Sequence, residues 1–353
     1  MKITILYKFR NTAWGGANQF LHALRNWFVS KGCYEEDPFK ADVGIFISYP
    51  FNNEDLFGTV HKLKKNTNTL IVNRMNGPIF LYRDQDVAVD KMNFIFNRHV
   101  ADGTIFQSKW SMEQCHKLGM IPNGYETIIG NAPDPGFFYR PDPSKNKVVG
   151  KTKIVAASWS DNYKKGFDTY QYLDDNLDFA RFEMTFIGRS PIIFKNINQL
   201  PILQSDKLAE TFRDHDMFVF ASKVETCSNI LMEALHCGLP AVARNNSSQP
   251  ELLGTGGLLF NDTRDVLDAI NKVSNNLNYY RSSIKVPTID EIGANYYNFC
   301  NRIYSEYREG KYTRKCWSNM RYYGLTARAH FWEKGTRIKN KLRKINENGN
   351  QPG

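Results

Sequence analysis

Short apolar runs alternate with helical patterns along most of the chain, and this alternation restricts the possible fold more than any other feature. In the first half, Gln19–Ser30 and Lys109–Leu118 have helical patterns. Alternation of this kind predicts βαβ units and a parallel sheet. The predicted strands of this half are Ile3–Tyr7, Val43–Ser48, Leu70–Asn73, Gly103–Phe106 and Glu126–Ile129.

A second alternation begins after the proline-rich segment Pro133–Lys147, which is typical of a linker. We therefore predict two doubly wound domains, at residues 1–147 and 148–289. A terminal helix at 290–310 and a basic, aromatic tail at 311–353 follow. The predicted strands of the second domain are Ile154–Ala157, Glu183–Ile187, Met217–Ala221, Ala241–Ala243 and Leu258–Phe260.

Two glutamates, Glu225 and Glu233, lie eight positions apart in the second domain. The pattern predicts Glu225 in the loop after the strand Met217–Ala221. Glu233 falls inside a short helix, Ser228–Leu235. Ligands of open α/β sheets bind at the carboxyl ends of the strands. Because ionised carboxylates only accept hydrogen bonds, the pair suits a ligand rich in hydroxyl groups, such as a sugar or a ribose.

The residues around the two glutamates resemble the nucleotide-sugar signature of family 4 glycosyltransferases. The resemblance implies the α/β fold called GT-B, in which two Rossmann-like doubly wound domains face a central cleft. It also implies that the helix at 290–310 packs back on the first domain. It assigns Glu233 to the nucleotide ribose, Glu225 to the donor sugar, and Ser228 and Asn229 to donor contacts. The motif residues are Glu225, Ser228-Asn229-Ile230, Glu233-Ala234-Leu235 and Cys237-Gly238-Leu239-Pro240.

The same resemblance predicts how the donor diphosphate is bound. Lys165, directly before Gly166, matches a lysine that supplies a cation in the family. The family also has an arginine a few residues before this lysine, but this chain has Trp159 and Ser160 in that region. Lys164 or Arg189 is therefore the expected second cation. Gly15 and Gly16, after Trp14, open a predicted helix whose N-terminus would face the pyrophosphate.

Fewer sequence features point to the acceptor site than to the donor site. Arg74 and Asn76 follow a strand of the first domain, where they either contact the acceptor or the transferred sugar, or support the loop. The segment Ile129–Phe137 is expected to set the geometry between the domains. Relatives often carry glycines before a Pro-Glu pair where this chain has Ser247–Glu251, so altered donor-sugar contacts are expected there.

The sequence gives little support for metal chemistry or another cofactor. It has no His, Cys and Glu spacing of a zinc site and no Gly-x-Ser-x-Gly motif. The Asp-x-Asp strings Asp84–Asp86 and Asp214–Asp216 lie in surroundings unlike those of a metal-dependent transferase, so we expect no metal and no cofactor. The six scattered cysteines favour reduced thiols and a cytoplasmic protein.

The net charge of +10 comes from the tail alone. Residues 311–344 contain 11 Lys or Arg residues and one acid, Glu333, which gives 11 − 1 = +10. Six aromatic residues are interleaved with these charges. This composition predicts peripheral binding to an anionic membrane surface, with a solvated tail that is partly packed on the first domain as the alternative. The tail aromatics are Tyr312, Trp317, Tyr322, Tyr323, Phe331 and Trp332.

The resemblance to family 4 implies a retaining, hexosyltransferase-type glycosyltransferase (EC 2.4). Its partners would be a nucleotide-sugar donor and a saccharide or lipid-linked acceptor, in glycan or polysaccharide biosynthesis. Three alternatives stay open: a GT-B sugar-nucleotide epimerase, an inactive transferase that acts as a binding partner, and a nucleic-acid-binding protein acting through the tail. Outside residues 311–344 the positive and negative charges balance, and this neutral body argues against nucleic acid as a partner.

Overall fold

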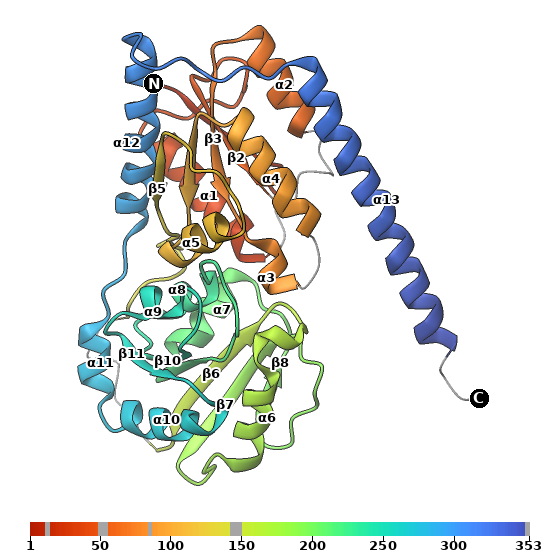
Figure 1. The fold of residues 1–353 in the computed structure, drawn as a ribbon. Coiled ribbons are helices and arrows are strands. Elements are labelled where there is room, and N and C mark those ends of the chain that lie inside the picture. The colour runs from red at the N-terminus through yellow and green to blue at the C-terminus, as the bar shows by residue number, and fades with distance from the viewer. Residues whose placement is uncertain (11–14, 49–55, 84–86, 142–149, 350–353) are drawn as a thin grey trace.

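Two sheets, each made of parallel strands, form the body of the protein and lie one above the other in Figure 1. The computed structural model describes residues 1–10, 15–48, 56–83, 87–141 and 150–349. Each sheet has one hydrophobic cluster on either face, because its covering helices bury apolar stripes against both sides. The predicted GT-B fold class is confirmed.

The first sheet has the strand order β1-β2-β3-β4-β5. Strands β1 to β4 are buried along their whole length, which explains why their sequences are nearly continuous apolar runs. The elements are β1 (Ile3–Leu6), α1 (Gly15–Ser30), β2 (Val43–Ile47), α2 (Leu56–Asn66), β3 (Leu70–Met75), α3 (Ile79–Arg83), α4 (Val87–His99), β4 (Gly103–Phe106), α5 (Lys109–Lys117) and β5 (Glu126–Ile128).

The second sheet has the order β11-β10-β9-β6-β7-β8. The chain runs outward from β6 to β8 and then returns to β9 on the other side of β6. The switch point of the topology, where ligands of such sheets bind, therefore lies between β6 and β9. The strands are β6 (Thr152–Ser158), β7 (Phe182–Gly188), β8 (Asn198–Leu200), β9 (Met217–Phe220), β10 (Ala241–Arg244) and β11 (Gly257–Phe260).

The helices of the second sheet connect these strands in sequence. They are the 3-10 turn η2 (Tyr163–Lys165), α6 (Phe167–Asn176), α7 (Ser205–Arg213), α8 (Asn229–His236), α9 (Gln249–Leu253), the 3-10 turn η3 (Thr263–Asp265), α10 (Val266–Ser274) and α11 (Leu277–Ser283). Below, the first domain is the unit built on β1–β5 and the second domain is the unit built on β6–β11.

The helix α12 (Ile289–Arg308) returns to the first domain and packs against α1. The two helices approach closely at Gly293, where an added Cβ would lie 2.3 Å from the Trp27 ring. Buried Tyr296, Phe299 and Ile303 of α12 complete the hydrophobic cluster on this face of the first sheet. The first domain therefore takes part of its core from the C-terminal third of the chain.

Residues 311–318 continue across the first domain and lead into α13 (Asn319–Gly349). Their anchor is buried Asp102, which accepts hydrogen bonds from the Tyr312 hydroxyl (2.9 Å) and from the Lys315 amide (2.8 Å). Trp317 packs against Phe57 and Phe96 of the first domain. From there α13 passes along α4 and extends beyond the first domain (Figure 1).

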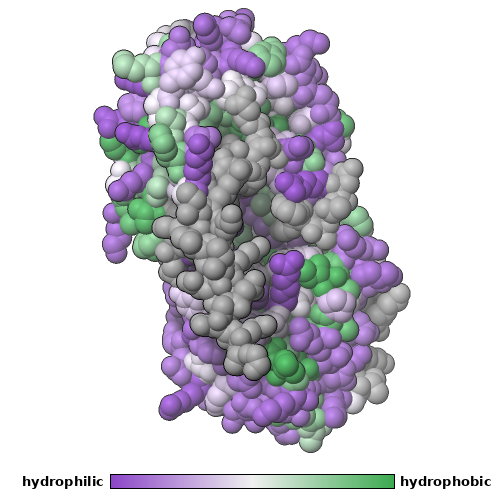
Figure 2. Space-filling view, turned by 90° about the vertical axis from the view of Figure 1, so that its right-hand side faces the viewer, coloured by the Kyte–Doolittle hydropathy of each residue, from purple (hydrophilic) through white to green (hydrophobic). Residues whose placement is uncertain are grey.

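Part of the tail packs on the first domain in this arrangement. Four of its six aromatic residues pack on the first domain, namely Tyr312, Trp317, Tyr322 and Trp332. Only Tyr323 and Phe331 are exposed. Seen from the side of α13, hydrophilic and hydrophobic residues are interspersed over the coloured surface (Figure 2). Among the described helices, none has the length and apolar content to cross a membrane.

Candidate functional site

A cavity of about 210 Å³ opens at the switch point of the second sheet, and we call it the switch-point cavity. The loops after β6 and β9 and the first turn of α8 form its walls. Three of the residues predicted for the donor, Lys165, Glu225 and Glu233, line it together with Ser228 and Asn229. Its other lining residues are Ala157, Ser158, Trp159, Ser160, Tyr170, Phe220, Ser222, Cys227 and Ile230.

Lys165 and Glu225 form an ion pair in this cavity. The Lys165 Nζ lies 2.5 Å from Glu225 Oε1, and the Ser222 hydroxyl donates to the same oxygen at 2.8 Å. Both side chains are only partly exposed. The pair therefore holds a cation and an anion ready at the carboxyl end of the sheet, where a ligand with phosphate and hydroxyl groups can replace each partner.

The position of Lys165 depends on the glycine that follows it. Gly166 ends η2 with φ +81°, and an added Cβ would lie 2.0 Å from the Ala221 carbonyl oxygen. Only glycine combines this backbone conformation with so close an approach. The glycine of the Lys-Gly pair is thus a structural requirement of the turn between β6 and α6.

Helix α8 carries Glu233 because its ends are well defined by the sequence. Ser228 is the N-cap, and its hydroxyl accepts a hydrogen bond from the Leu231 amide. At the other end, Gly238 has φ +83° and lets the chain leave the helix. The apolar face of α8 is buried against β9 and β10. Ser228 therefore caps the helix as well as lining the cavity.

Glu233 is the most perturbed carboxyl group of the site. It is 5% exposed, and no hydrogen-bond donor or cation among the described residues contacts it. Burial raises its pKa from 4.5 to about 8, because a charged carboxylate is poorly solvated there. A buried carboxyl group without a partner is a feature of binding sites more than of stable cores.

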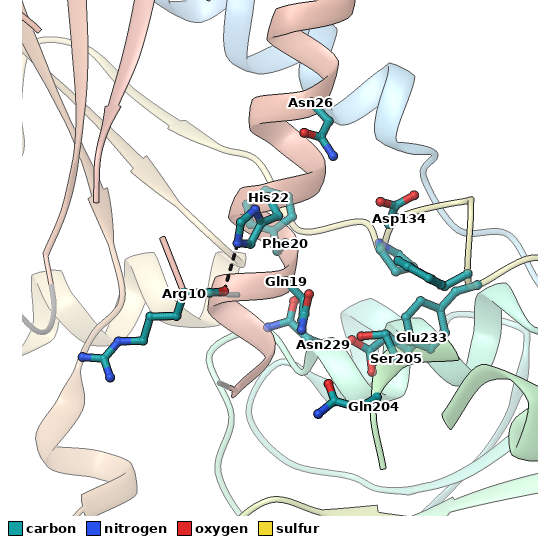
Figure 3. A pocket seen from close by; sticks show the side chains of 13 residues that line it. Arg10, Gln19, Phe20, His22, Asn26, Asp134, Gln204, Ser205, Asn229 and Glu233 are labelled. Carbon is teal, nitrogen blue, oxygen red and sulfur yellow. Dashed lines mark hydrogen bonds between the residues drawn. The ribbon is translucent and has the colours of Figure 1, made fainter. Parts of the chain in front are cut away.

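A second cavity, of about 290 Å³, lies on the other side of Asn229 and Glu233 and extends to helix α1 of the first domain (Figure 3). We call it the α1 cavity. Gln19, His22 and Asn26 contribute polar side chains from α1, and Gln204 and Ser205 contribute them from the start of α7. None of these residues was predicted from the sequence, because single polar residues on a helix face do not form a recognisable motif.

A buried hydrogen-bond network connects the two domains beside these cavities. The Asn131 side chain donates to Asn229 Oδ1 at 3.0 Å and accepts from Arg74 Nη2 at 2.7 Å. Arg74 also donates to Tyr296, Asn76 and Gln107. Asn229 thus contributes to the contact between the domains in addition to lining both cavities.

Of the two roles expected for Arg74, the network favours support of the loop. Its side chain is completely buried, with each guanidinium nitrogen engaged by a neighbouring side chain. It therefore supports the loop and the domain contact, which is the second of the two roles expected for it. Asn76 is half-buried and receives one of its bonds from Arg74, so it belongs to the same network.

The two candidates for a second cation also differ from expectation. Lys164 turns away from the switch-point cavity, and its Nζ donates to the Leu81 carbonyl of the first domain at 2.6 Å. The Arg189 side chain is exposed and does not line the cavity, although its amide donates to the Ser158 carbonyl. Neither supplies a second cation to the cavity in this arrangement.

The remaining predicted residues are placed as follows. Gly15 and Gly16 form the first turn of α1, whereas Trp14 lies outside the described residues. Asp84–Asp86 also lies outside them. Asp214 ends α7, and Asp216 accepts from the Lys153 amide and pairs with Arg281, so both have structural roles. In the described parts of the chain, no three His, Cys, Asp or Glu side chains are grouped to hold a metal.

Comparisons with known proteins agree with this geometry. Residues 185–276, from β7 to α10, match the family described as "Glycosyl transferases group 1". The sulfoquinovosyl transferase SQD2 of Arabidopsis thaliana is 30% identical over 145 residues, which are 37% of this chain. The match spans 26% of the length of that plant protein.

Solved structures resemble most of the chain at low sequence identity. Anabaena HepE, solved in complex with UDP-glucose, has a TM-score of 0.59 and 13% identity over 88% of this chain and 99% of its own. Sucrose-phosphate synthase from Thermosynechococcus elongatus has a TM-score of 0.54 and 14% identity over 83% of this chain and 78% of its own. Residues 185–276 of the second domain thus match the group 1 glycosyltransferases, and most of the chain has the two-domain GT-B fold of the solved structures.

Proposed function

We propose that the protein is a retaining glycosyltransferase, which moves a sugar from a nucleoside diphosphate donor to a saccharide or lipid-linked acceptor in glycan biosynthesis. The observation that carries this proposal is the convergence of Lys165, Glu225 and Glu233 on one cavity at the switch point. The family match, which covers Glu225 and Glu233, and the neighbour solved with UDP-glucose support it.

In this proposal each of the three residues has a separate role. The diphosphate takes Lys165 away from Glu225, and the released carboxylate then accepts hydrogen bonds from the donor sugar. Glu233, one turn into α8, accepts from the ribose hydroxyls. The N-terminal amides of α8 and α1, the latter beginning at Gly15, add positive potential near the leaving group.

Transfer then needs little acid–base chemistry from the protein. The bond between the anomeric carbon and the diphosphate oxygen breaks, and the acceptor oxygen bonds to the same face of the sugar. The proton of the acceptor hydroxyl passes to the departing diphosphate. Stabilising that leaving group is the main task, which Lys165 and the helix N-termini perform without a metal ion in this proposal.

The first test is a thermal-shift panel of UDP, GDP, ADP and CMP and their sugar conjugates, without added metal. We expect one nucleotide series to raise the melting temperature of the wild type and to have no effect on Glu233→Ala. Glu210→Ala, which removes an exposed carboxylate on α7, is the matched control and should keep the shift. Stabilisation of Glu233→Ala equal to that of the wild type would contradict the ribose assignment.

An epimerase is the alternative enzyme that uses the same donor. It would interconvert sugar nucleotides without any acceptor, whereas a transferase releases nucleoside diphosphate only as sugar reaches an acceptor. NMR of the donor incubated with the protein alone separates the two. In this proposal the ionisable lining residues Lys165, Glu225 and Glu233 all hold the donor, which leaves no acid–base pair for abstraction of a sugar proton.

We also propose that α13 attaches the protein to the cytoplasmic face of an anionic membrane. Met320, Tyr323 and Phe331 are 83%, 66% and 73% exposed, and their spacing places them along one face of the helix. Arg321 and Arg328 are exposed on the same helix. An exposed apolar stripe next to basic residues is typical of helices that lie at a lipid interface.

Vesicle binding tests this attachment. Because Trp317 and Leu325 pack on the first domain, removal of the whole tail would also damage the fold. A triple change of Met320, Tyr323 and Phe331 to Ser leaves that packing intact. We expect the wild type to float with phosphatidylglycerol vesicles and the triple variant to stay in solution. Equal flotation of the two proteins would exclude the stripe as the anchor.

A further inference from the structure

We propose that Glu251 is a positioning residue, which couples the contact between the two domains to the placement of the Lys165–Glu225 pair. The consequence for the reaction rests on the proposed function, whereas the contact itself does not.

Glu251 completes a helix that belongs to the other domain. It lies on α9 of the second domain, and α9 faces the start of α5 in the first domain (Figure 1). Its Oε2 accepts from the Lys109 amide and its Oε1 from the Trp110 amide, both at 2.8 Å. The side chain of Ser108, the N-cap of α5, accepts a hydrogen bond from the Ser111 amide and from neither of these two amides. A carboxylate on two free amides of a helix N-terminus is a charge-assisted, dipole-favoured contact.

The residues directly before Glu251 hold the loop that carries Glu225. The Glu225 amide donates to the Ser247 hydroxyl at 2.9 Å, and the Ser248 amide donates to the Glu225 carbonyl at 3.3 Å. The Gln249 side chain, which is fully buried, donates to the Ser222 carbonyl at 2.7 Å. Through α9, the contact on α5 therefore fixes the backbone on both sides of Glu225.

The cationic member of the pair is fixed to the first domain as well. Lys164, the neighbour of Lys165, reaches the Leu81 carbonyl of α3. Lys165 is thus linked to the first domain through its neighbour in the chain. Glu225 is linked to it through the hydrogen bonds to Ser247 and Ser248, which precede Glu251. If the domains separate, the second domain keeps its donor-binding groups, but both loops lose the partner that sets their relative position.

This arrangement predicts that Glu251 affects the rate of transfer more than nucleotide affinity. Glu251→Gln keeps the side-chain length but leaves one acceptor oxygen for two amides. We expect kcat to fall about 10-fold to 100-fold, the size of effect that misplaced reacting groups produce. The Kd of the nucleoside diphosphate should stay within about two-fold, since closure is not needed for it to bind.

Amide hydrogen exchange tests the contact without any assay of activity. In Glu251→Gln the Lys109 and Trp110 amides should exchange about tenfold faster than in the wild type, since they lose a charged acceptor. Glu113→Gln is the matched control, because Glu113 lies on the same helix, is exposed, and pairs only with the Lys109 side chain, at 3.8 Å. That variant should leave both amides and kcat unchanged.

Three results would overturn the proposal. Equal exchange of the two amides in wild type and Glu251→Gln would mean that the contact is absent in solution. Faster exchange with unchanged kcat would mean that it does not influence the pair. A loss of nucleotide affinity as large as the loss of kcat would indicate a general defect of the second domain. If no donor supports transfer, the exchange result still decides the contact, and only the proposed function fails.

Discussion

Glu233 is the single residue whose environment is most informative about function. Its carboxyl group is buried without a partner, and its pKa is raised to about 8 by that burial. The folded protein therefore holds a proton that the unfolded chain releases near pH 4.5. The stability that this proton supports is complete below about pH 4.5 and is lost as the pH rises toward 8.

Replacement by glutamine makes this linkage measurable. We expect Glu233→Gln to gain stability relative to the wild type as the pH rises from 5 to 8, by about 1 kcal/mol or more, because the variant has no charge to bury. Urea denaturation at several pH values measures the difference. If the free energy of unfolding changed with pH in the same way in both proteins, burial would not hinder the ionisation of Glu233.

Nucleotide binding should act on the same proton. Ribose hydroxyls would stabilise the ionised carboxylate, so binding at about pH 7.5 should release a proton from the wild type. Calorimetry in two buffers with different ionisation enthalpies measures this release. Glu233→Gln should show less release than the wild type, and identical release from both would contradict a ribose contact at Glu233.

At the residue scale the sequence predicted Glu225 and Glu233 from one motif around β9 and α8, and Lys165 from the Lys-Gly pair after β6. It could not predict the environment of Arg74 or Lys164. Arg74 meets Tyr296 from a helix that begins 215 positions later, and Lys164 meets Leu81 from the other domain. Contacts of this kind depend on the packing of distant elements, which leaves no local pattern.

Among the elements, the turn between β6 and α6 shows how backbone geometry places a charge. Gly166→Ala adds a Cβ that would lie 2.0 Å from the Ala221 carbonyl oxygen, in a backbone conformation that alanine disfavours. We expect a loss of stability of about 1–3 kcal/mol and a loss of nucleotide binding, because Lys165 must move. Thermal unfolding with and without nucleotide measures both effects.

Gly119 provides the control for this prediction. Its φ of +93° is as unfavourable for alanine, but an added Cβ would meet nothing within 4 Å. Gly119→Ala should therefore cost only about 1 kcal/mol and leave nucleotide binding unchanged. If the two variants behaved alike, the contact with Ala221 would not be what positions Lys165.

The sheets were predictable at this scale because strands buried on both faces are nearly continuous apolar runs. All ten strands predicted from the sequence are present, with ends that differ by at most two residues. The short strand β8 was not predicted, since Asn198–Leu200 is mostly exposed at the sheet edge. The helix α13 was also missed, because its buried stripe is interrupted by many charges.

In the whole molecule, Asp102 connects the C-terminal segment to the first sheet. Its buried carboxylate pairs with buried Lys64 at 2.5 Å and accepts from Ile71, Tyr312 and Lys315. Asp102→Asn leaves the Lys64 cation without its counter-ion, and such a change costs about 3–5 kcal/mol. We expect a large loss of stability and easy proteolysis at 311–318.

The exposed pair of Lys207 and Glu210 is the comparison for that variant. Glu210→Gln should change stability by less than about 1 kcal/mol, as is usual for exposed ion pairs. Urea denaturation of both variants measures the contrast. A small effect of Asp102→Asn would show that other contacts, such as Trp317 on Phe57, are sufficient to hold the segment.

The return of α12 and α13 to the first domain has a consequence for synthesis of the protein on the ribosome. The second domain is one continuous stretch and can complete its core as soon as about residue 284 has emerged. The first domain, although made first, lacks Tyr296, Ile303, Trp317 and Leu325 until nearly the whole chain is out. The domain that is translated second is therefore the one that folds first, and the nascent N-terminal half must stay soluble meanwhile.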